Sequence, residues 1–131
     1  MSCGIKCLSM AIQNFAQIES VPIPTNRDEG EDIDRKLVVK VVNIEGKCPV
    51  YKVGEKIVLD EGYRINLKQS NNICMYSLAS IMPYYVALYN GVSPKNLGLA
   101  NKEGRACVHC LDPCELTGGG TVTFEIIIEG D

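Results

Sequence analysis

The chain has 131 residues, of which 46% are hydrophobic and 22% charged, and its formal net charge is −3. This length fits a single domain that can bury a hydrophobic core without a metal ion or disulfides. The sequence has no tryptophan and no cluster of basic residues. It therefore lacks the electrostatic pattern of a nucleic-acid-binding protein, and we expect no nucleic-acid partner.

The sequence is rich in cysteine, with seven cysteines and one histidine. An odd number leaves at least one thiol unpaired in any intramolecular set of disulfides. The first twenty residues do not resemble an export signal, because they contain one lysine and because Gln13 and Asn14 interrupt the apolar run. We therefore expect a cytoplasmic, reducing location. There, clustered cysteines more often bind metal, carry out redox chemistry or pack in the core than form structural disulfides.

Residues 1–20 are predicted to form an amphipathic helix. Apolar side chains recur there at the spacing of one helical face, at Ile5, Leu8, Ile12 and Phe15. Cys3 and Cys7 share a different face, and their role stays open. Residues 21–35 contain prolines and a run of acidic residues, which is typical of a solvated linker. The compact domain is therefore expected to span residues 36–131.

Four stretches of the compact domain predict β-strands: 37–46, 57–59, 105–110 and 121–130. The last stretch places four apolar residues on one face, namely Val122, Phe124, Ile126 and Ile128. The residues expected on its opposite face are Thr121, Thr123, Glu125 and Glu129.

The uncharged stretch NNICMYSLASIMPYYVALYNG predicts the main helix, which begins at Asn71 or Asn72 and ends at Asn90. One apolar stripe consists of Cys74, Leu78, Ile81, Tyr85 and Leu88, and a second of Met75, Met82, Val86 and Tyr89. A helix that is apolar over so much of its girth is expected to be buried on more than one side. Pro83 cannot donate to the carbonyl of Ala79, so it is expected to kink the helix or to break it into two.

Polar residues and prolines shorten the apolar part of this helix, so we expect no membrane span. Two strands, a helix and two further strands predict an α+β domain. Its expected architecture is an antiparallel sheet of about four strands packed on one long helix that Pro83 kinks or splits, with the N-terminal helix as an addition.

The stretch RACVHCLDPC, residues 105–114, concentrates candidate metal ligands. They are Cys107, His109, Cys110 and Cys114. Thiolates and imidazole are ligands that zinc prefers, and thiolates also hold iron–sulfur clusters. In an extended strand, however, Cys107 and His109 face one way and Cys110 faces the other. This alternation argues against a cradle formed by the stretch alone.

Several short motifs follow one another along the chain: EGKCPVYKVGEKIVL, a cysteine at the start of a helix (Cys74), GVSPKNLGLA, CLDP and GGGTVTFEI. In these motifs the chain from Lys36 to Glu129 resembles a small prokaryotic family that is common in anaerobes and has no known activity. The resemblance implies a site built from three separate elements, because Cys48, Cys74 and Cys110 match positions where the family carries cysteine. The residues that fall outside the family pattern are Cys3, Cys7, Cys107, His109 and Cys114.

The trio has some physical support. Cys74 is expected in the first turn of its helix, where unpaired backbone N–H groups stabilise a thiolate. Lys47 and Lys52 flank Cys48 and favour its thiolate in the same way. The competing interpretation is that these cysteines are simply buried, since free cysteine behaves as a small hydrophobe.

Three hypotheses for the function follow. The first is a small accessory, electron-transfer or sensing module that binds zinc or an iron–sulfur cluster. Its predicted ligands are Cys48, Cys74 and Cys110, with Cys107, His109 or Cys114 completing the shell. The second is a thiol redox protein, and the third is a non-catalytic accessory or oligomerising domain with buried cysteines. No acid–base or nucleophile–base pair stands out, so we predict no catalytic residue and expect a protein partner or a second copy of the chain.

Overall fold

The computed structural model describes residues 34–130, which belong to the unit Ile33–Asp131. The predicted helix over residues 1–20, Cys3, Cys7 and nearly all of the predicted linker lie outside the described residues.

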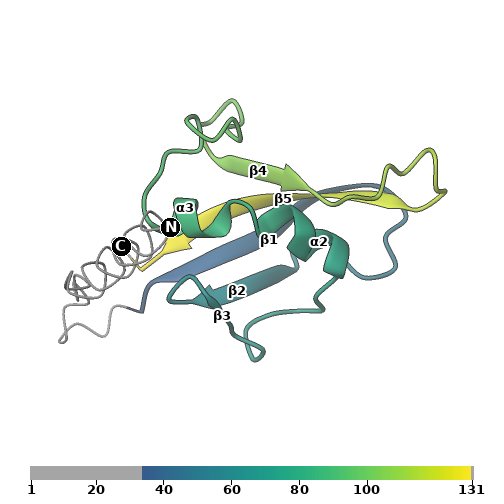
Figure 1. The fold of residues 1–131 in the computed structure, drawn as a ribbon. Helices are drawn as coiled ribbons and strands as arrows, with labels where there is room; N and C mark the ends of the chain where they lie inside the picture. Colours follow the sequence, from purple (N-terminus) through teal and green to yellow (C-terminus); the bar gives the residue numbers. More distant parts are fainter. Residues whose placement is uncertain (1–33, 131) are drawn as a thin grey trace, which may run out of the picture. The chain divides into compact units, whose positions relative to one another are not determined.

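The described part of the chain is built on a five-stranded antiparallel sheet with the strand order β3-β2-β1-β5-β4 (Figure 1). Its strands are β1 (Lys36–Gly46), β2 (Lys56–Asp60), β3 (Arg64–Ile65), β4 (Ala106–His109) and β5 (Gly120–Glu129). The longest pairing joins β1 and β5, from Lys36 opposite Glu129 to Gly46 opposite Gly120. Four of the strands lie in the stretches whose sequence patterns predicted strands, and β3 is an addition.

The prediction of one long helix is wrong. Two short helices, α2 (Met75–Ile81) and α3 (Tyr85–Tyr89), replace it, and both contribute to the core on one face of the sheet (Figure 1). Pro83 separates them, because it has no N–H to continue the helical hydrogen bonds. The fold is therefore mostly a five-stranded sheet with two short helices, and not a four-stranded sheet packed on one long helix.

The helical segment also begins later than predicted, because tertiary hydrogen bonds hold its first residues against β2. The backbone N–H of Asn71 donates to the carbonyl of Lys56 at 2.9 Å, and the N–H of Lys56 donates to the Asn71 side chain at 3.0 Å. Ser70 Oγ accepts the N–H of Val58 at 2.8 Å. Asn71 thus extends the edge of the sheet and is not an N-cap.

The core lies between the helices and one face of the sheet. Its fully buried members come from alternate positions of the long strands, as period-2 patterning requires. The largest are Leu37, Val39, Val41, Ile57, Val122 and Phe124. The alternation predicted for β5 is confirmed, because Val122, Phe124 and Ile126 are buried in this cluster while Thr121 and Thr123 are only partly buried.

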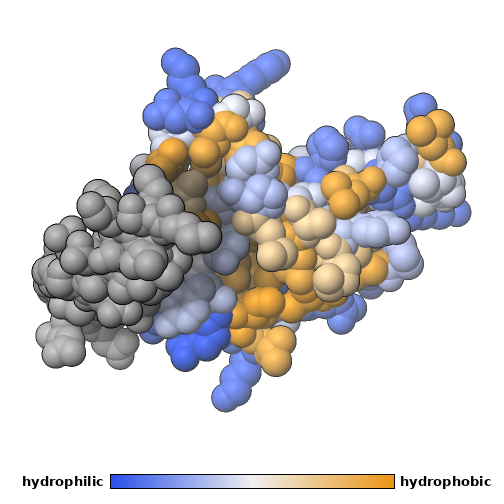
Figure 2. Space-filling view, viewed as in Figure 1, coloured by the Kyte–Doolittle hydropathy of each residue, from blue (hydrophilic) through white to orange (hydrophobic). Residues whose placement is uncertain are grey.

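The outer face of the helices departs from prediction. Met75, Met82 and Val86 of the second apolar stripe are 74%, 63% and 54% exposed, and hydrophobic side chains gather on the surface over α2 in Figure 2. The expectation that this segment is buried on more than one side is therefore wrong for these three residues. Within residues 34–130, no helix has the length and apolarity needed to cross a membrane.

Candidate functional site

Three cysteines that are far apart in the sequence line one cavity of about 250 Å³. Cys48 lies in the loop after β1, Cys74 immediately precedes α2, and Cys110 immediately follows β4. All three are free thiols. We call this cavity the thiol pocket. Its other lining residues are Pro49, Val50, Tyr51, Tyr76, Ser77, Asp112, Gly120 and Val122.

The loop that carries Cys48 is held against the start of β5. The N–H of Lys47 donates to the carbonyl of Gly119 at 3.0 Å. Gly120 allows this close approach, because a Cβ atom at that position would lie 2.7 Å from the backbone of Lys47. The glycine at the start of β5 therefore lets the backbone of β5 pack against the backbone of Lys47, and this contact positions Cys48.

Cys48 receives two backbone hydrogen bonds on its sulfur. The N–H groups of Val50 and Tyr51 each donate to Cys48 Sγ at 3.4 Å. Pro49, whose φ is fixed, lies between the sulfur-bearing residue and these donors and favours the turn that brings them back. Donors that point at sulfur stabilise negative charge on it, which is what a nucleophilic or metal-bound thiolate needs.

Cys110 is the most enclosed of the three, with only 5% of its surface exposed. Its N–H donates to the carbonyl of Val122 at 2.9 Å, so the pairing with β5 continues one residue past β4. Cys110 Sγ in turn accepts the N–H of Val122 at 3.2 Å. This thiol is therefore held rigidly at the inner wall of the pocket.

Cys74 differs from its predicted position. It precedes α2 with an extended backbone (φ −97°, ψ 136°), and its side chain makes no capping hydrogen bond. Because the Cys74 side chain accepts no N–H of the first turn of α2, the argument that the helix N-terminus stabilises a Cys74 thiolate finds no support. Its backbone N–H donates instead to the hydroxyl of Tyr51 at 2.8 Å.

Tyr51 and Ser77 bring two hydroxyl groups to the thiol pocket, and the sequence reasoning missed both. Tyr51 is buried, and its ring packs edge-on against Phe124 with 5.6 Å between centroids. Burial raises the pKa of Tyr51, and the neighbouring Ser77 side chain and Cys74 N–H only partly offset this effect. The tyrosine hydroxyl therefore stays protonated at neutral pH.

Ser77 is fully buried, and its hydroxyl has no hydrogen-bond partner. The Ser77 side chain lowers the pKa of Tyr51 as a hydrogen-bonding neighbour does, but the two groups do not form a hydrogen bond of normal geometry. The signal for both residues was local. Tyr51 follows Cys48 by three positions and Ser77 follows Cys74 by three, which is the spacing of neighbours in a turn or helix.

The other predicted ligands do not line the thiol pocket. Cys107 lies on β4 beside Glu125, and burial, reinforced by that carboxylate, raises its pKa. The Nδ1 atom of His109 lies 3.0 Å from the carbonyl oxygen of Cys110. Cys114 sits in a turn with φ +43°, its sulfur 3.4 Å from the carbonyl of Glu45. The alternation along β4 thus separates Cys107 from Cys110, as strand geometry predicted.

No group of three or more His, Cys, Asp or Glu side chains within residues 34–130 is arranged to hold a metal ion. The predicted trio shares a pocket, but its sulfurs do not form a ready ligand set in this arrangement.

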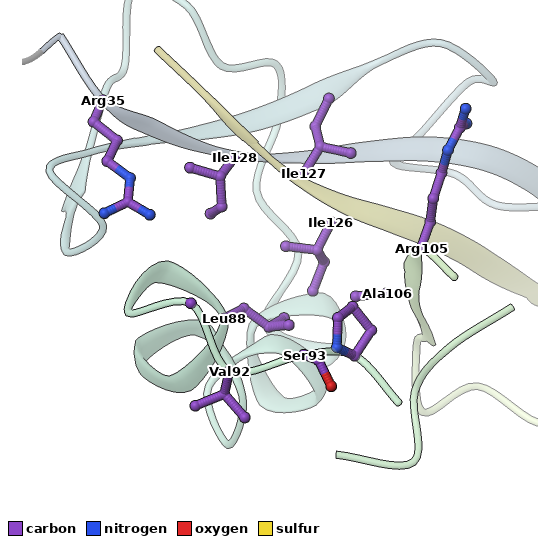
Figure 3. Close-up of a pocket in the computed structure, with 11 residues that line it drawn as sticks. Arg35, Leu88, Val92, Ser93, Arg105, Ala106, Ile126, Ile127 and Ile128 are labelled. Atoms are coloured by element: carbon purple, nitrogen blue, oxygen red, sulfur yellow. The ribbon is translucent and has the colours of Figure 1, made fainter. Parts of the chain in front are cut away.

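A second cavity, of about 280 Å³, lies between the end of α3 and β5 (Figure 3). Leu88 and Ile126 point into it, and Arg35 and Arg105 stand on opposite sides (Figure 3). The Arg105 guanidinium is paired with Glu125 at 3.0 Å. The lining residues of this cavity include no cysteine, so the thiol pocket is the stronger candidate for chemistry.

No protein-family model, no curated protein and no solved structure matches the chain. The resemblance to the prokaryotic family with a K-C-P motif stays a prediction.

Proposed function

We propose that the protein is a small thiol redox protein whose reactive centre is the thiol pocket. The observation that carries the proposal is the arrival of Cys48, Cys74 and Cys110 at one cavity from three separate elements. A reversible disulfide needs only two thiols that meet, whereas a metal site needs three or four ligands that converge on one point. The three cysteines share a pocket but do not form a ready set of metal ligands. This arrangement therefore suits a disulfide better than a metal site.

Cys48 is the nucleophile in this proposal, because two N–H groups point at its sulfur and because the thiolate is the reactive form of cysteine. Its thiolate attacks one sulfur of a small disulfide, the external S–S bond breaks, and one thiolate leaves. Cys74 or Cys110 then attacks the Cys48 sulfur and releases the second thiolate. Two electrons pass from the protein to the external disulfide, and an external thiol in excess reverses the reaction.

The test is to count protein thiols and to map disulfides by mass spectrometry after equilibration in glutathione buffers of stepped potential. We expect one reversible disulfide between two pocket cysteines, and its loss in Cys48→Ser. Cys107→Ser and Cys114→Ser are matched controls, because neither residue lines the pocket, and both should keep the disulfide. Equal oxidation of Cys48→Ser and the wild type, or no pocket disulfide at any potential, would refute the proposal.

A second candidate is the binding of zinc or an iron–sulfur cluster by Cys48, Cys74 and Cys110, with water or a partner as the fourth ligand, because Cys107, His109 and Cys114 do not line the pocket. The hydrogen bonds to Cys48 Sγ favour it, because donors to ligand sulfurs tune and support metal–thiolate centres. Such a group would supply Lewis-acid or electron-transfer chemistry. Metal content and absorption of protein purified without oxygen decide the matter. Stoichiometric zinc or iron that is lost in Cys48→Ser supports this candidate, and metal-free protein with an intact pocket disulfide rejects it.

A protein partner or a second copy of the chain remains part of the proposal. The exposed Met75, Met82 and Val86 on the helices provide an apolar surface beside the pocket residue Tyr76. A cytoplasmic location would keep the pocket thiols reduced between turnovers.

A further inference from the structure

The unpartnered hydroxyl of Ser77 is the polar feature of the thiol pocket that the redox proposal does not use. Ser77 is fully buried, lines the pocket, and has no hydrogen-bond partner for its Oγ atom. Nearly all buried polar side-chain atoms in proteins are hydrogen-bonded, so such a group calls for a bound molecule that completes it.

Tyr51 offers a second hydroxyl at the same place. Its oxygen accepts the N–H of Cys74, so its own proton is free to be donated to another acceptor. Because the phenol is buried and its pKa is raised, it keeps this proton at neutral pH. Two O–H donors therefore belong to residues that line the same pocket as the three thiols.

The remaining lining is apolar. Pro49, Val50 and Val122 supply hydrocarbon surface, and a cavity of about 250 Å³ has room for a small organic molecule. The pocket thus combines a nucleophilic sulfur, two donors for an oxygen acceptor and an apolar wall.

We infer that Ser77 and Tyr51 bind the oxygen atoms of an organic hydroperoxide, and that this class of oxidant is the substrate of the thiol pocket. The inference rests on the proposed redox function and names the electron acceptor. A disulfide has no oxygen at its reacting bond and makes no use of the two hydroxyls, whereas a hydroperoxide presents both of its oxygens to them.

The chemistry balances with the groups present. The Cys48 thiolate attacks the terminal oxygen of R–O–O–H, the O–O bond breaks, and its electron pair stays on the inner oxygen. Cys48 becomes a sulfenic acid. The alkoxide R–O⁻, held by the two hydroxyls, takes up a proton and leaves as the alcohol R–OH. The thiol of Cys74 or Cys110 then attacks the sulfenic sulfur, which forms the disulfide and releases water. A small external thiol restores both cysteines.

The test compares two oxidants on the full chain, reduced and handled without oxygen. Rapid-mixing kinetics follow the loss of pocket thiols with cumene hydroperoxide and with the aromatic disulfide 4,4′-dithiodipyridine. The variants are Ser77→Ala and Tyr51→Phe. Ser80→Ala is the matched control, since Ser80 lies on the same helix but donates to the Tyr76 carbonyl and does not line the pocket.

We expect Ser77→Ala and Tyr51→Phe each to slow the hydroperoxide reaction by roughly 100- to 1,000-fold, the range found when a donor to a developing oxyanion is removed. Their rates with the aromatic disulfide should stay within about twofold of the wild type, and Ser80→Ala should change neither rate. A fold-wide disturbance would slow both oxidants alike, so the selectivity separates substrate binding from structural damage.

The outcomes separate the two proposals. If the wild type forms its pocket disulfide with the aromatic disulfide but is inert to hydroperoxide, the inference fails and the redox function stands. Unchanged hydroperoxide rates in both variants also overturn the inference, and Ser77 then holds only a water molecule. If neither oxidant produces a pocket disulfide, both proposals fail.

Discussion

The backbone N–H of Cys74 donates a 2.8 Å hydrogen bond to the hydroxyl of Tyr51. These residues are 23 positions apart, and the bond ties the start of α2 to the loop that carries Cys48. One buried phenol thus joins two of the three elements of the thiol pocket and also offers a proton inside it.

This bond predicts the stability of a phenylalanine variant. Tyr51→Phe keeps the ring against Phe124 but leaves the Cys74 N–H without its acceptor, so it should lower the free energy of unfolding by about 1–2 kcal/mol. Urea denaturation monitored by circular dichroism gives the value. Tyr76→Phe is the control, since that side chain is 57% exposed, and it should change stability by less than about 0.5 kcal/mol. Equal effects of the two substitutions would contradict the role of the bond.

Ser77→Ala should have the opposite sign. It removes a buried hydroxyl that has no partner and introduces a better helix former, so the free energy of unfolding should rise by about 1 kcal/mol. Thermal unfolding of the reduced, ligand-free protein measures the change. If Ser77 binds the substrate, the Ser77→Ala protein should be more stable than the wild type and yet react more slowly with hydroperoxide. A clear loss of stability would show that the Ser77 hydroxyl has a partner in the folded protein.

Alanine substitutions at Gly46 and Gly54 distinguish the cost of a steric collision from the cost of backbone strain. Both have positive φ, +75° and +95°, so alanine at either position is strained. A Cβ atom at Gly46 would also collide with Cys114 Sγ and the carbonyl of Gly119, whereas at Gly54 it meets nothing within 4 Å. We expect Gly54→Ala to cost about 1 kcal/mol and Gly46→Ala roughly 2–4 kcal/mol.

The readouts for this pair are chemical denaturation and pocket-disulfide formation. Gly46→Ala should also slow disulfide formation, because the collision displaces the loop that leads to Cys48. If the Gly46→Ala protein is as stable as the Gly54→Ala protein, the turn around Cys114 moves without cost and the predicted collision does not destabilise the fold.

Asp112 gives a pH-dependent prediction. The Thr117 hydroxyl and then the Cys114 N–H donate to its carboxylate and lower its pKa below the ordinary value of 3.8. Since the folded-state pKa is depressed, the ionised carboxylate contributes stability above about pH 3.8, and this contribution is lost as the pH falls through the lower, folded-state pKa.

Thr117→Val removes the largest cause and should move the pKa of Asp112 up toward 3.8. NMR titration of the Asp112 carboxyl carbon measures the shift. Thr121→Val is the matched control, because the Thr121 hydroxyl donates to the backbone carbonyl of Asp112 and not to its carboxylate. Identical titration curves for the two variants would rule out the hydroxyl as the cause.

Much of the local structure follows from short-range pattern. The alternation of Val122, Phe124 and Ile126 predicts both the strand and its buried face, because side chains of a strand point to opposite sides in turn. Pro83 interrupts the helix for an equally local reason, the missing N–H. The resemblance to the prokaryotic family implied a site of Cys48, Cys74 and Cys110, and the structure brings these three cysteines to one pocket.

The sequence alone was therefore enough to predict four of the five strands of the sheet and a kink or a break of the helix at Pro83. The start of α2 depends on tertiary contacts, because Ser70 and Asn71 bond to β2 and not to their own helix. Tertiary packing alone also left Met75 exposed, enclosed Ser77 without a partner and set the Tyr51 hydroxyl against Cys74. These contacts join residues that are distant in the chain, and no periodicity of neighbouring residues encodes them.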